Sequence, residues 1–209
     1  DVMAATLALA VKHQVQIGAH PAYPDLQGFG RRSMKLSRDS IKNLVLYQIS
    51  ALDGLAQSLG AMVEYVKPHG ALYNDMMRDT VVFESVLDAV QAYHRPLCLM
   101  LQSMPDNQKR IALAQQRNIP LIFEVFADRR YTDEGLLTPR TQPNAVLSLE
   151  EVEAQVRVLV SEGKLYSESG KSLFLPVDSI CVHGDDATSL EKAKLVSRIV
   201  KEHMAKRNA

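Results

Sequence analysis

Three of the six histidines come directly after short apolar runs that are typical of β-strands. These runs end in Gly18-Ala19-His20-Pro21, Lys67-Pro68-His69-Gly70 and Cys181-Val182-His183-Gly184-Asp185. Because the carboxyl ends of parallel strands lie on one face of a sheet or barrel, we expect these side chains to converge. An imidazole that titrates near neutral pH and is oriented by a carboxylate is suited to proton transfer. The sequence therefore predicts an acid–base site with His20, His69, His183 and Asp185 as its catalytic groups.

Cationic and acidic side chains accompany the histidines. Lys67 ends the second strand, where a half-buried ammonium can bind a carboxylate or a phosphate. Arg31 follows a glycine in Phe29-Gly30-Arg31-Arg32, an arrangement that suits an anion but equally an exposed loop. The fourth strand ends in Glu124-Val125-Phe126-Ala127-Asp128-Arg129. Asp128, Arg129 and Arg130 form either part of the site or a solvated ion-pair cluster.

A metal site is the main alternative chemistry. Imidazoles with carboxylates also suit zinc, manganese or iron, and His20, His69, His183 and Asp185 could supply the ligands. No HxxxH or CxxC pair is present, so acid–base chemistry is favoured and the metal is left unassigned. The sequence also contains no phosphate loop, no GxGxxG turn after a strand and no GxSxG nucleophile elbow.

Composition narrows the class of protein. The 209 residues carry 24 basic and 24 acidic side chains, and a net charge of zero argues against nucleic-acid binding. No apolar stretch approaches the ~20 residues of a membrane span, and the first residues lack the pattern of a signal peptide. We expect a cytoplasmic protein that forms a single domain over residues 1–209, with no membrane partner. Cys98 and Cys181 lie in apolar runs that predict buried, reduced thiols.

The order of the predicted elements indicates an α/β fold. Apolar strand-like runs alternate with amphipathic helical segments, as in parallel βα units. The expected strands are 15–19, 62–66, 97–102, 120–126 and 180–182, and the expected helices are 2–11, 37–59, 80–93, 107–117, 148–162 and 189–204. Two long connections, 20–36 and 128–147, exceed the usual loop length, which is typical of lids and binding loops.

Several segments together resemble one known family. They are Gly18 to Asp25, Phe29-Gly30-Arg31, Tyr65 to Asn74, Glu124 to Arg129, Tyr131, Leu137 to Gln142 and Cys181 to Asp185. In this order and spacing they are similar to the signature segments of the LamB/YcsF lactam-utilisation family. The resemblance implies a distorted seven-stranded (β/α) barrel of the glycoside hydrolase and deacetylase type.

The resemblance also implies a reaction. Family members are the A subunits of a bacterial ATP-dependent 5-oxoprolinase, which opens the lactam of 5-oxo-L-proline to L-glutamate together with subunits B and C. ATP with Mg²⁺ is the implied cofactor, and the small lactam is the implied ligand. Catalysis is then expected from the three histidines, Asp185 and Lys67. Substrate and phosphate binding are expected from Arg31, Tyr73, Glu124, Asp128 and Arg129.

One feature departs from the family pattern. Family members begin with an Asn-Ala-Asp-Leu-Gly-Glu-like segment, which a Cys-Gly-Phe-His-Ala-Gly-Asp-like segment follows. The given sequence starts at Asp1, which matches the last residue of the second segment. We therefore expect a barrel that lacks its N-terminal strand or strands and has little activity alone. Two other functions stay open: a metal-dependent, deacetylase-like hydrolase on a related barrel, and a non-catalytic subunit that binds the substrate.

Overall fold

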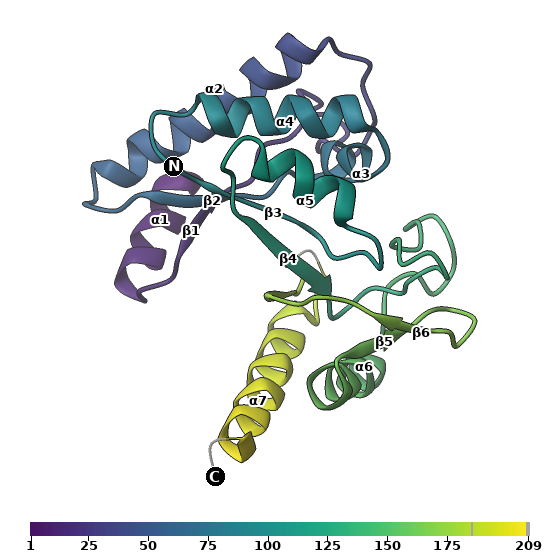
Figure 1. The fold of residues 1–209 in the computed structure, drawn as a ribbon. Coiled ribbons are helices and arrows are strands. Elements are labelled where there is room, and N and C mark those ends of the chain that lie inside the picture. The colour runs from purple at the N-terminus through teal and green to yellow at the C-terminus, as the bar shows by residue number, and fades with distance from the viewer. Residues whose placement is uncertain (185, 208–209) are drawn as a thin grey trace. The chain divides into compact units, whose positions relative to one another are not determined.

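The structure is a computed structural model that describes residues 1–184 and 186–207. The predicted catalytic residue Asp185 lies outside the described residues. The chain divides into two compact units (Figure 1). The first consists of Asp1–Leu101 and Gln108–Ile122, and the second of Gln102–Asn107 and Phe123–Ala209. The expectation of one domain over the whole chain stays a prediction.

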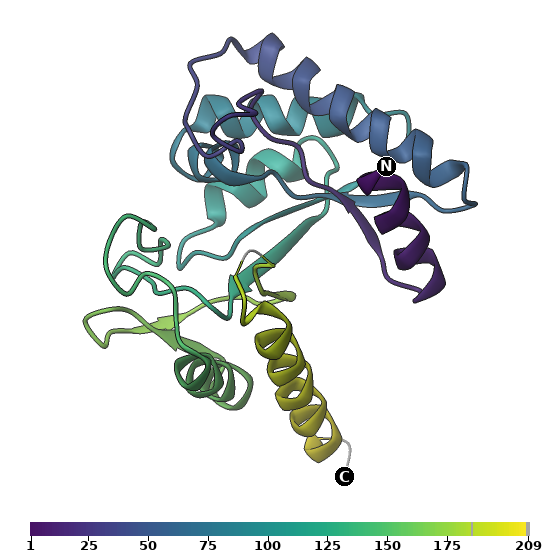
Figure 2. The ribbon, with the colours of Figure 1, turned by 180° about the vertical axis from the view of Figure 1, so that it is seen from behind.

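The first unit contains parallel strands and most of the helices. Its strands are β1 (Ile17–Ala19), β2 (Val63–Val66) and β3 (Cys98–Gln102), whose last residue belongs to the second unit. Its helices are α1 (Val2–Lys12), α2 (Arg38–Gln57), α3 (Gly70–Arg78), α4 (Thr80–Ala92) and α5 (Gln108–Gln115). Strand β2 pairs in parallel with both β1 and β3, and α2 packs along α4 (Figures 1 and 2).

Helix α2 shows how the sequence builds this unit. Ser37 caps its first turn by accepting the amide of Ser40, which replaces a hydrogen bond missing at the helix start. Ile41, Val45 and Ile49 are spaced four residues apart, so they share one buried face of the helix. One turn further on, the buried Asp53 accepts hydrogen bonds from the amide of Val63 and from three side chains. Asp53 thereby fixes the start of β2 against α2.

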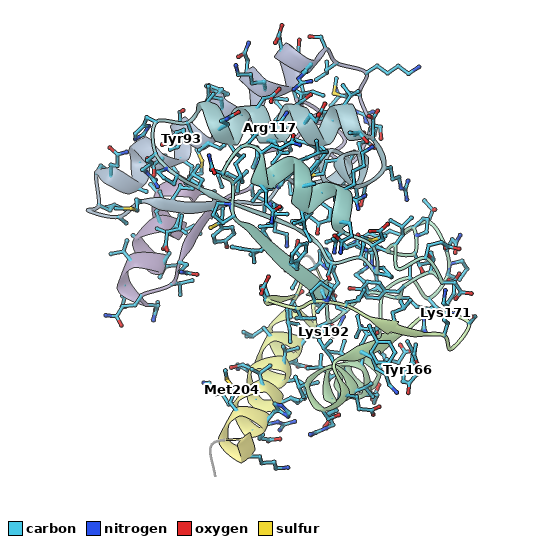
Figure 3. The ribbon with its side chains drawn as sticks, viewed as in Figure 1. Tyr93, Arg117, Tyr166, Lys171, Lys192 and Met204 are labelled. Carbon is cyan, nitrogen blue, oxygen red and sulfur yellow. The ribbon has the colours of Figure 1, made fainter. Side chains whose placement is uncertain are left out.

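Asp53 also illustrates how a buried charge is compensated. Burial alone would raise the pKa of its carboxyl group, but the hydrogen bonds from Tyr93, Val63, Gln57 and Arg95 outweigh burial and lower the pKa to about 2. Tyr93, labelled in Figure 3, donates its hydroxyl hydrogen to Asp53 at 2.6 Å. The carboxylate therefore stays ionised inside the first unit.

The second unit combines a parallel strand pair with a small antiparallel hairpin. Strand β4 (Leu121–Phe126), which begins in the first unit, pairs in parallel with β7 (Ser179–Cys181). Strands β5 (Lys164–Tyr166) and β6 (Ser172–Phe174) form the hairpin. Helices α6 (Leu149–Glu162) and α7 (Ser189–Arg207) pack together over an apolar cluster that includes Val152, Val156, Leu195 and Ile199.

Helix α6 begins and ends as the sequence predicts. Ser148 and Glu151 form a capping box, in which each side chain accepts the backbone amide of the other residue. Gly163 ends the helix with φ of 65°, the left-handed conformation that glycine adopts at little cost. Both signals could be recognised because they depend on neighbouring residues only.

The expected α/β class is confirmed, with differences in detail. Each expected strand and helix is observed, with its bounds within three residues of the expected ones at each end. Helix α3 and the β5–β6 hairpin were not expected, because only three residues separate α3 from β2 and each hairpin strand has only three residues. Neither Cys98 nor Cys181 forms a disulfide within the described chain, and both are half-buried. No helix in the described residues has the length and apolar character needed to cross a membrane.

Candidate active site

His20 and His69 are brought together in the first unit by backbone pairing that continues past β1 and β2. The amide of Lys67 donates to the carbonyl of Ala19, and the amide of His69 donates to the carbonyl of Pro21, both at 2.8 Å. His20 lies between those two acceptors in the sequence. The predicted approach of these two histidines is confirmed.

The two imidazoles contact each other and two backbone carbonyls. Nε2 of His20 lies 3.0 Å from Nδ1 of His69. On the outer sides, Nδ1 of His20 lies 2.6 Å from the Lys67 carbonyl oxygen, and Nε2 of His69 lies 2.8 Å from the Phe29 carbonyl oxygen. The rings meet edge to face, with centroids 4.8 Å apart. All four ring nitrogens therefore have a partner within hydrogen-bonding distance.

Two glycines make the close approach to His69 possible. Gly30 and Gly70 have φ of 67° and 59°, and the amide of Ala71 donates to the Gly30 carbonyl at 2.9 Å. A Cβ on Gly70 would lie 2.5 Å from that carbonyl oxygen, and a Cβ on Gly30 would lie 2.8 Å from Cβ of Ala22. Both positions thus require glycine for space as well as for conformation.

The loop that carries Phe29 is held by an internal ion pair. Asp25, which is buried, accepts hydrogen bonds from the guanidinium of Arg32 and from the amide of Gly28. The Arg32 hydrogen bond lowers the pKa of Asp25 to about 2, although burial opposes this shift. The ion pair therefore shapes the loop that offers the Phe29 carbonyl to His69.

The predicted cations of the first unit border the histidine pair. Arg31 is exposed, and its guanidinium lies over the ring of Phe29 at 5.4 Å from the centroid. Lys67 is half-buried and supplies the carbonyl that contacts His20. Tyr73 is on α3 and only 5% exposed, so it packs in the interior of the unit.

His183 forms a second centre, in the second unit, with Asp128. Nδ1 of His183 lies 2.9 and 3.0 Å from the two carboxylate oxygens of Asp128, and its backbone amide donates to the same carboxylate at 3.1 Å. The ring of Phe126 stacks on the imidazole with centroids 5.5 Å apart. Because Asp128 occupies Nδ1, Nε2 is the nitrogen left to exchange a proton with a ligand.

The carboxylate of Asp128 is buried but ionised. Burial is the largest influence on its pKa and raises it, yet hydrogen bonding and charge attraction from His183 together bring the pKa below its ordinary value. Asp128 is 1% exposed, whereas the His183 side chain is 24% exposed. Asp128 thus contacts His183 rather than solvent, and the imidazole is the accessible member of the dyad.

The elements around the dyad fix its geometry. In the β4–β7 pair Phe126 is opposite Cys181, and the amide of Ala127 donates to the Cys181 carbonyl at 2.9 Å. The side-chain amide of Gln155 on α6 donates to the carbonyls of Phe126, Ala127 and Arg129 at 3.0, 3.0 and 3.1 Å. Sequence reasoning missed Gln155, because a glutamine on an amphipathic helix gives no local signal of its partners.

A buried lysine holds the loop that follows His183. Lys192, labelled near the start of α7 in Figure 3, is 2% exposed and binds a carboxylate oxygen of Asp186 at 3.0 Å. Asp186 also accepts the amide and hydroxyl hydrogens of Thr188. The hydrogen bond from the Thr188 hydroxyl has the largest effect and that from Lys192 the next largest. Together these contacts hold the pKa of Asp186 well below its usual range.

Arg129 and Glu124 are buried in the second unit. The guanidinium of Arg129 is 6% exposed and donates to the carbonyls of Ala145 and Thr138 at 3.2 and 2.5 Å. These contacts brace the loop of residues 128–147. The alternative of a solvated ion-pair cluster is wrong for Asp128 and Arg129, since both side chains are buried. Glu124 is 1% exposed on β4.

The described residues bring no ready-made metal site together. Within residues 1–184 and 186–207, no three His, Cys, Asp or Glu side chains are grouped so that they could hold a metal ion. The geometry instead consists of a histidine pair in one unit and a histidine–aspartate dyad in the other. Both are arrangements that hold and transfer protons.

Comparison with known proteins gives the family. The model of the LamB/YcsF family matches residues 1–209. This chain belongs to the LamB/YcsF family. Among family members, it is 50% identical over 191 residues to a Vibrio campbellii protein named as the A subunit of 5-oxoprolinase, an alignment that covers 91% of this chain and 75% of that one. It is 47% identical over 189 residues to a Pseudomonas aeruginosa protein named as the third 5-oxoprolinase A subunit, covering 90% and 75% of the two chains.

A solved structure of a lactam-utilisation protein is also similar. The crystal structure of the lactam utilization protein from Thermus thermophilus matches with a TM-score of 0.85 and 32% sequence identity. The match covers 96% of this chain and 79% of that chain. The resemblance expected from the signature segments is therefore confirmed at the level of the family.

Proposed function

We propose that this LamB/YcsF chain is a subunit of an ATP-dependent 5-oxoprolinase. With subunits B and C as partners, it opens the lactam of 5-oxo-L-proline to give L-glutamate, and the complex hydrolyses ATP. The relatives named as 5-oxoprolinase A subunits support this assignment. Because the reaction consumes ATP, we assign it to the cytoplasm. The family resemblance supports a distorted seven-stranded (β/α) barrel as the complete fold.

The observation that carries a catalytic role is the Asp128–His183 dyad. A lactam is a stable amide, and transfer of a phosphoryl group from ATP to its carbonyl oxygen would expose the carbonyl carbon to attack by water. Nε2 of His183 then takes a proton from the attacking water, while Asp128 stabilises the resulting imidazolium through Nδ1. The imidazolium of His183 gives this proton to the ring nitrogen as the C–N bond breaks, and a second water then releases phosphate from the glutamyl phosphate that remains. Because Asp128 acts through His183, we assign it a positioning role rather than direct contact with substrate.

The cations near the histidine pair suit the charges of this reaction. Lys67 and Arg31 lie on the loops around His20 and His69, where they could stabilise the substrate carboxylate or phosphate oxygens. ATP is the expected cosubstrate of the complex, with Mg²⁺ bound to its phosphates. Lys67 and Arg31 fit such a ligand because both are cations, one half-buried and the other exposed.

The proposal is tested with this protein and purified subunits B and C. Glutamate and ADP are measured with 5-oxoproline, without it, and without ATP. We expect equal amounts of glutamate and ADP that require both compounds, and no 5-oxoproline-dependent ADP formation would refute the proposal. A His183→Ala complex that keeps the wild-type kcat would instead support the alternative of a non-catalytic, substrate-binding subunit.

A further inference from the structure

The loop between β1 and α2, dark purple in Figure 2, presents two large apolar side chains to solvent. Leu26 is 96% exposed and Phe29 is 67% exposed. Single exposed apolar residues are common on protein surfaces. These two, however, lie at opposite ends of one turn, in which the amide of Phe29 donates to the Leu26 carbonyl at 3.3 Å. We call residues 25–32, which contain this turn, the loop tip.

Hydrogen bonds and an ion pair inside the loop tip hold it in one shape. The amide of Gly30 donates to the Asp25 carbonyl at 2.8 Å and closes the turn. The Asp25 carboxylate accepts the amide of Gly28 at 3.0 Å and pairs with the guanidinium of Arg32. Gly28 is needed for this packing, since a Cβ there would overlap a carboxylate oxygen of Asp25. The shape of the loop tip is therefore fixed by its own residues.

Helices α2 and α3 hold the loop on both sides of its tip. Asp75 on α3 accepts the hydroxyl hydrogens of Tyr23 and Ser33 at 3.1 and 2.9 Å. Gln48 on α2 exchanges two hydrogen bonds with the backbone of Ala22, at 3.0 and 2.9 Å. Because these contacts order the loop in advance, binding through its tip would cost little conformational entropy.

Phe29 adopts a backbone conformation that bulky residues rarely use. Its φ is 54°, in the left-handed region that glycine and asparagine prefer. In this conformation the side chain remains largely exposed, while the carbonyl oxygen lies 2.8 Å from Nε2 of His69. Such strain persists where the surroundings impose it, and it is concentrated at binding and catalytic sites. The conformation of Phe29 therefore favours a binding role for the loop tip.

The exposed charges of the loop are positive. Arg31 and Lys35 are exposed, whereas Asp25, the single acidic residue in 24–37, is buried in its ion pair. Carboxylates on a partner would complement these cations, and an apolar pocket would accept Leu26. A symmetric contact between two copies of the loop tip would bring the same cations together, which disfavours a second copy of this chain as the partner.

We propose that the loop tip docks into an apolar pocket, bordered by carboxylates, on a partner subunit of the 5-oxoprolinase complex. Leu26 is the apolar anchor, and Arg31 and Lys35 form the cationic rim. The docked subunit lies beside the histidine pair, because the Phe29 carbonyl contacts His69. This position suits a reaction divided between subunits, since an activated lactam then has a short path between them. The inference rests on the proposed function for the identity of the partner.

The test is the dissociation constant between this chain and purified subunits B and C, measured by titration calorimetry. Leu26→Gln keeps the length of the side chain but removes the apolar anchor, so binding should weaken at least about tenfold. Leu190→Gln on α7 is the matched control, because Leu190 is 65% exposed in the second unit, and its effect should stay below about twofold. Equal dissociation constants for Leu26→Gln and wild type would overturn the proposal.

Folding of the Leu26→Gln variant is checked separately. Because Leu26 is 96% exposed, chemical denaturation should give the same free energy of unfolding for the variant and wild type. Weaker binding by an equally stable variant supports the docking role directly.

Lys35→Glu tests the cationic rim. The association rate should fall about three- to tenfold at low salt, and the difference should shrink as ionic strength rises. Lys194→Glu reverses the charge of an exposed lysine on α7 and should change the rate less than about twofold. An association rate that depends on neither Lys35 nor ionic strength would refute the carboxylate border of the pocket.

Two further measurements examine other occupants of the loop tip. Sedimentation of the chain alone should show no association through Leu26, and a dimer that Leu26→Gln dissociates would identify a second copy as the partner and overturn the proposal. In the reconstituted complex, Leu26→Gln should leave KM for 5-oxoproline unchanged once the subunits are saturated. A raised KM with an unchanged subunit dissociation constant would show that the tip binds the small ligand instead.

Failure of this inference and failure of the proposed function are distinguishable. A wild-type complex that releases glutamate, together with a Leu26→Gln complex that forms and works equally well, would refute only the docking role of the loop tip. A wild-type chain that neither binds subunits B and C nor supports 5-oxoproline-dependent ADP formation would refute both.

Discussion

The two histidine centres differ in what accepts their N–H groups, and this difference sets their chemistry. In the second unit, Nδ1 of His183 contacts the buried carboxylate of Asp128. In the first unit, ring nitrogens of His20 and His69 contact each other and the backbone carbonyls of Lys67 and Phe29. A carboxylate neutralises the proton that an imidazole gains, which favours a base, whereas carbonyls leave a positive charge uncompensated. The contact with Asp128 therefore makes His183 the better candidate for a general base.

The largest expected effect comes from removing the charge of the dyad. Asp128→Asn keeps the shape of the side chain but no longer holds a proton on Nδ1 of His183 or stabilises its imidazolium. We expect kcat of the reconstituted complex to fall on the order of 10²- to 10⁴-fold. Steady-state glutamate release measures the change.

The matched control for Asp128→Asn is Asp133→Asn in the same loop. Asp133 accepts hydrogen bonds from Ser167 and Ser169 and has no contact with a histidine in those bonds. Asp133→Asn should change kcat by less than about threefold, because substitutions that break no buried network usually have small effects. Equal losses in both variants would show that loop integrity, not the dyad, limits the rate.

Glycine substitution tests the geometry of the histidine pair. Gly30→Ala introduces a side chain at φ of 67° and 3.2 Å from Cδ2 of His69. We expect a loss of about 2–4 kcal/mol in the free energy of unfolding, from backbone strain and crowding together. Gly60→Ala is the control, because its φ is 71° but nothing lies within 4 Å of the added Cβ. If denaturant unfolding shows equal losses, crowding at Gly30 is not significant.

Gln155 tests the support of the dyad. Gln155→Leu removes the amide that donates to three carbonyls around Asp128, and leaving buried carbonyls without a donor costs about 1–3 kcal/mol. Arg157→Ala on the same helix removes an exposed pair with Glu153, for which we expect only about 0.3–0.5 kcal/mol. Chemical denaturation of both variants checks the ranking, and a larger effect for Arg157→Ala would contradict it.

The smallest expected effect is a change in the free energy of unfolding at acidic pH. The pKa of Asp128 is lower in the folded chain than its unfolded value of about 3.9, so its stabilisation is complete above that pH. The stabilisation is lost as pH falls through the lowered pKa. The stability difference between wild type and Asp128→Asn should therefore shrink below about pH 4. Unfolding curves measured from neutral pH downward test this, and a difference that grows towards acid would have the wrong sign.

The sequence predicted the first centre better than the second. His20 and His69 could be paired because each follows a strand, and parallel neighbours bring strand ends together. The partner of His183 could not be found in this way. Asp128 is 55 residues away in the sequence and reaches His183 through the β4–β7 register.

Local signals account for the parts of the fold that were predicted. Capping at Ser37 and Ser148 and the glycine at 163 act over a few residues, so they could be recognised in the chain. The contacts of Gln155 and the buried ion pair of Lys192 depend on elements far apart in sequence. Such contacts become visible only once the fold is known.

The protonation of His183 tests the central distinction most directly. ¹⁵N NMR of the histidine-labelled protein can show whether the proton resides on Nδ1 or on Nε2. With Asp128 present, we predict a hydrogen-bonded proton on Nδ1, and loss of this preference in Asp128→Asn. A neutral His183 protonated on Nε2, or a spectrum unchanged by Asp128→Asn, would contradict its role as the base.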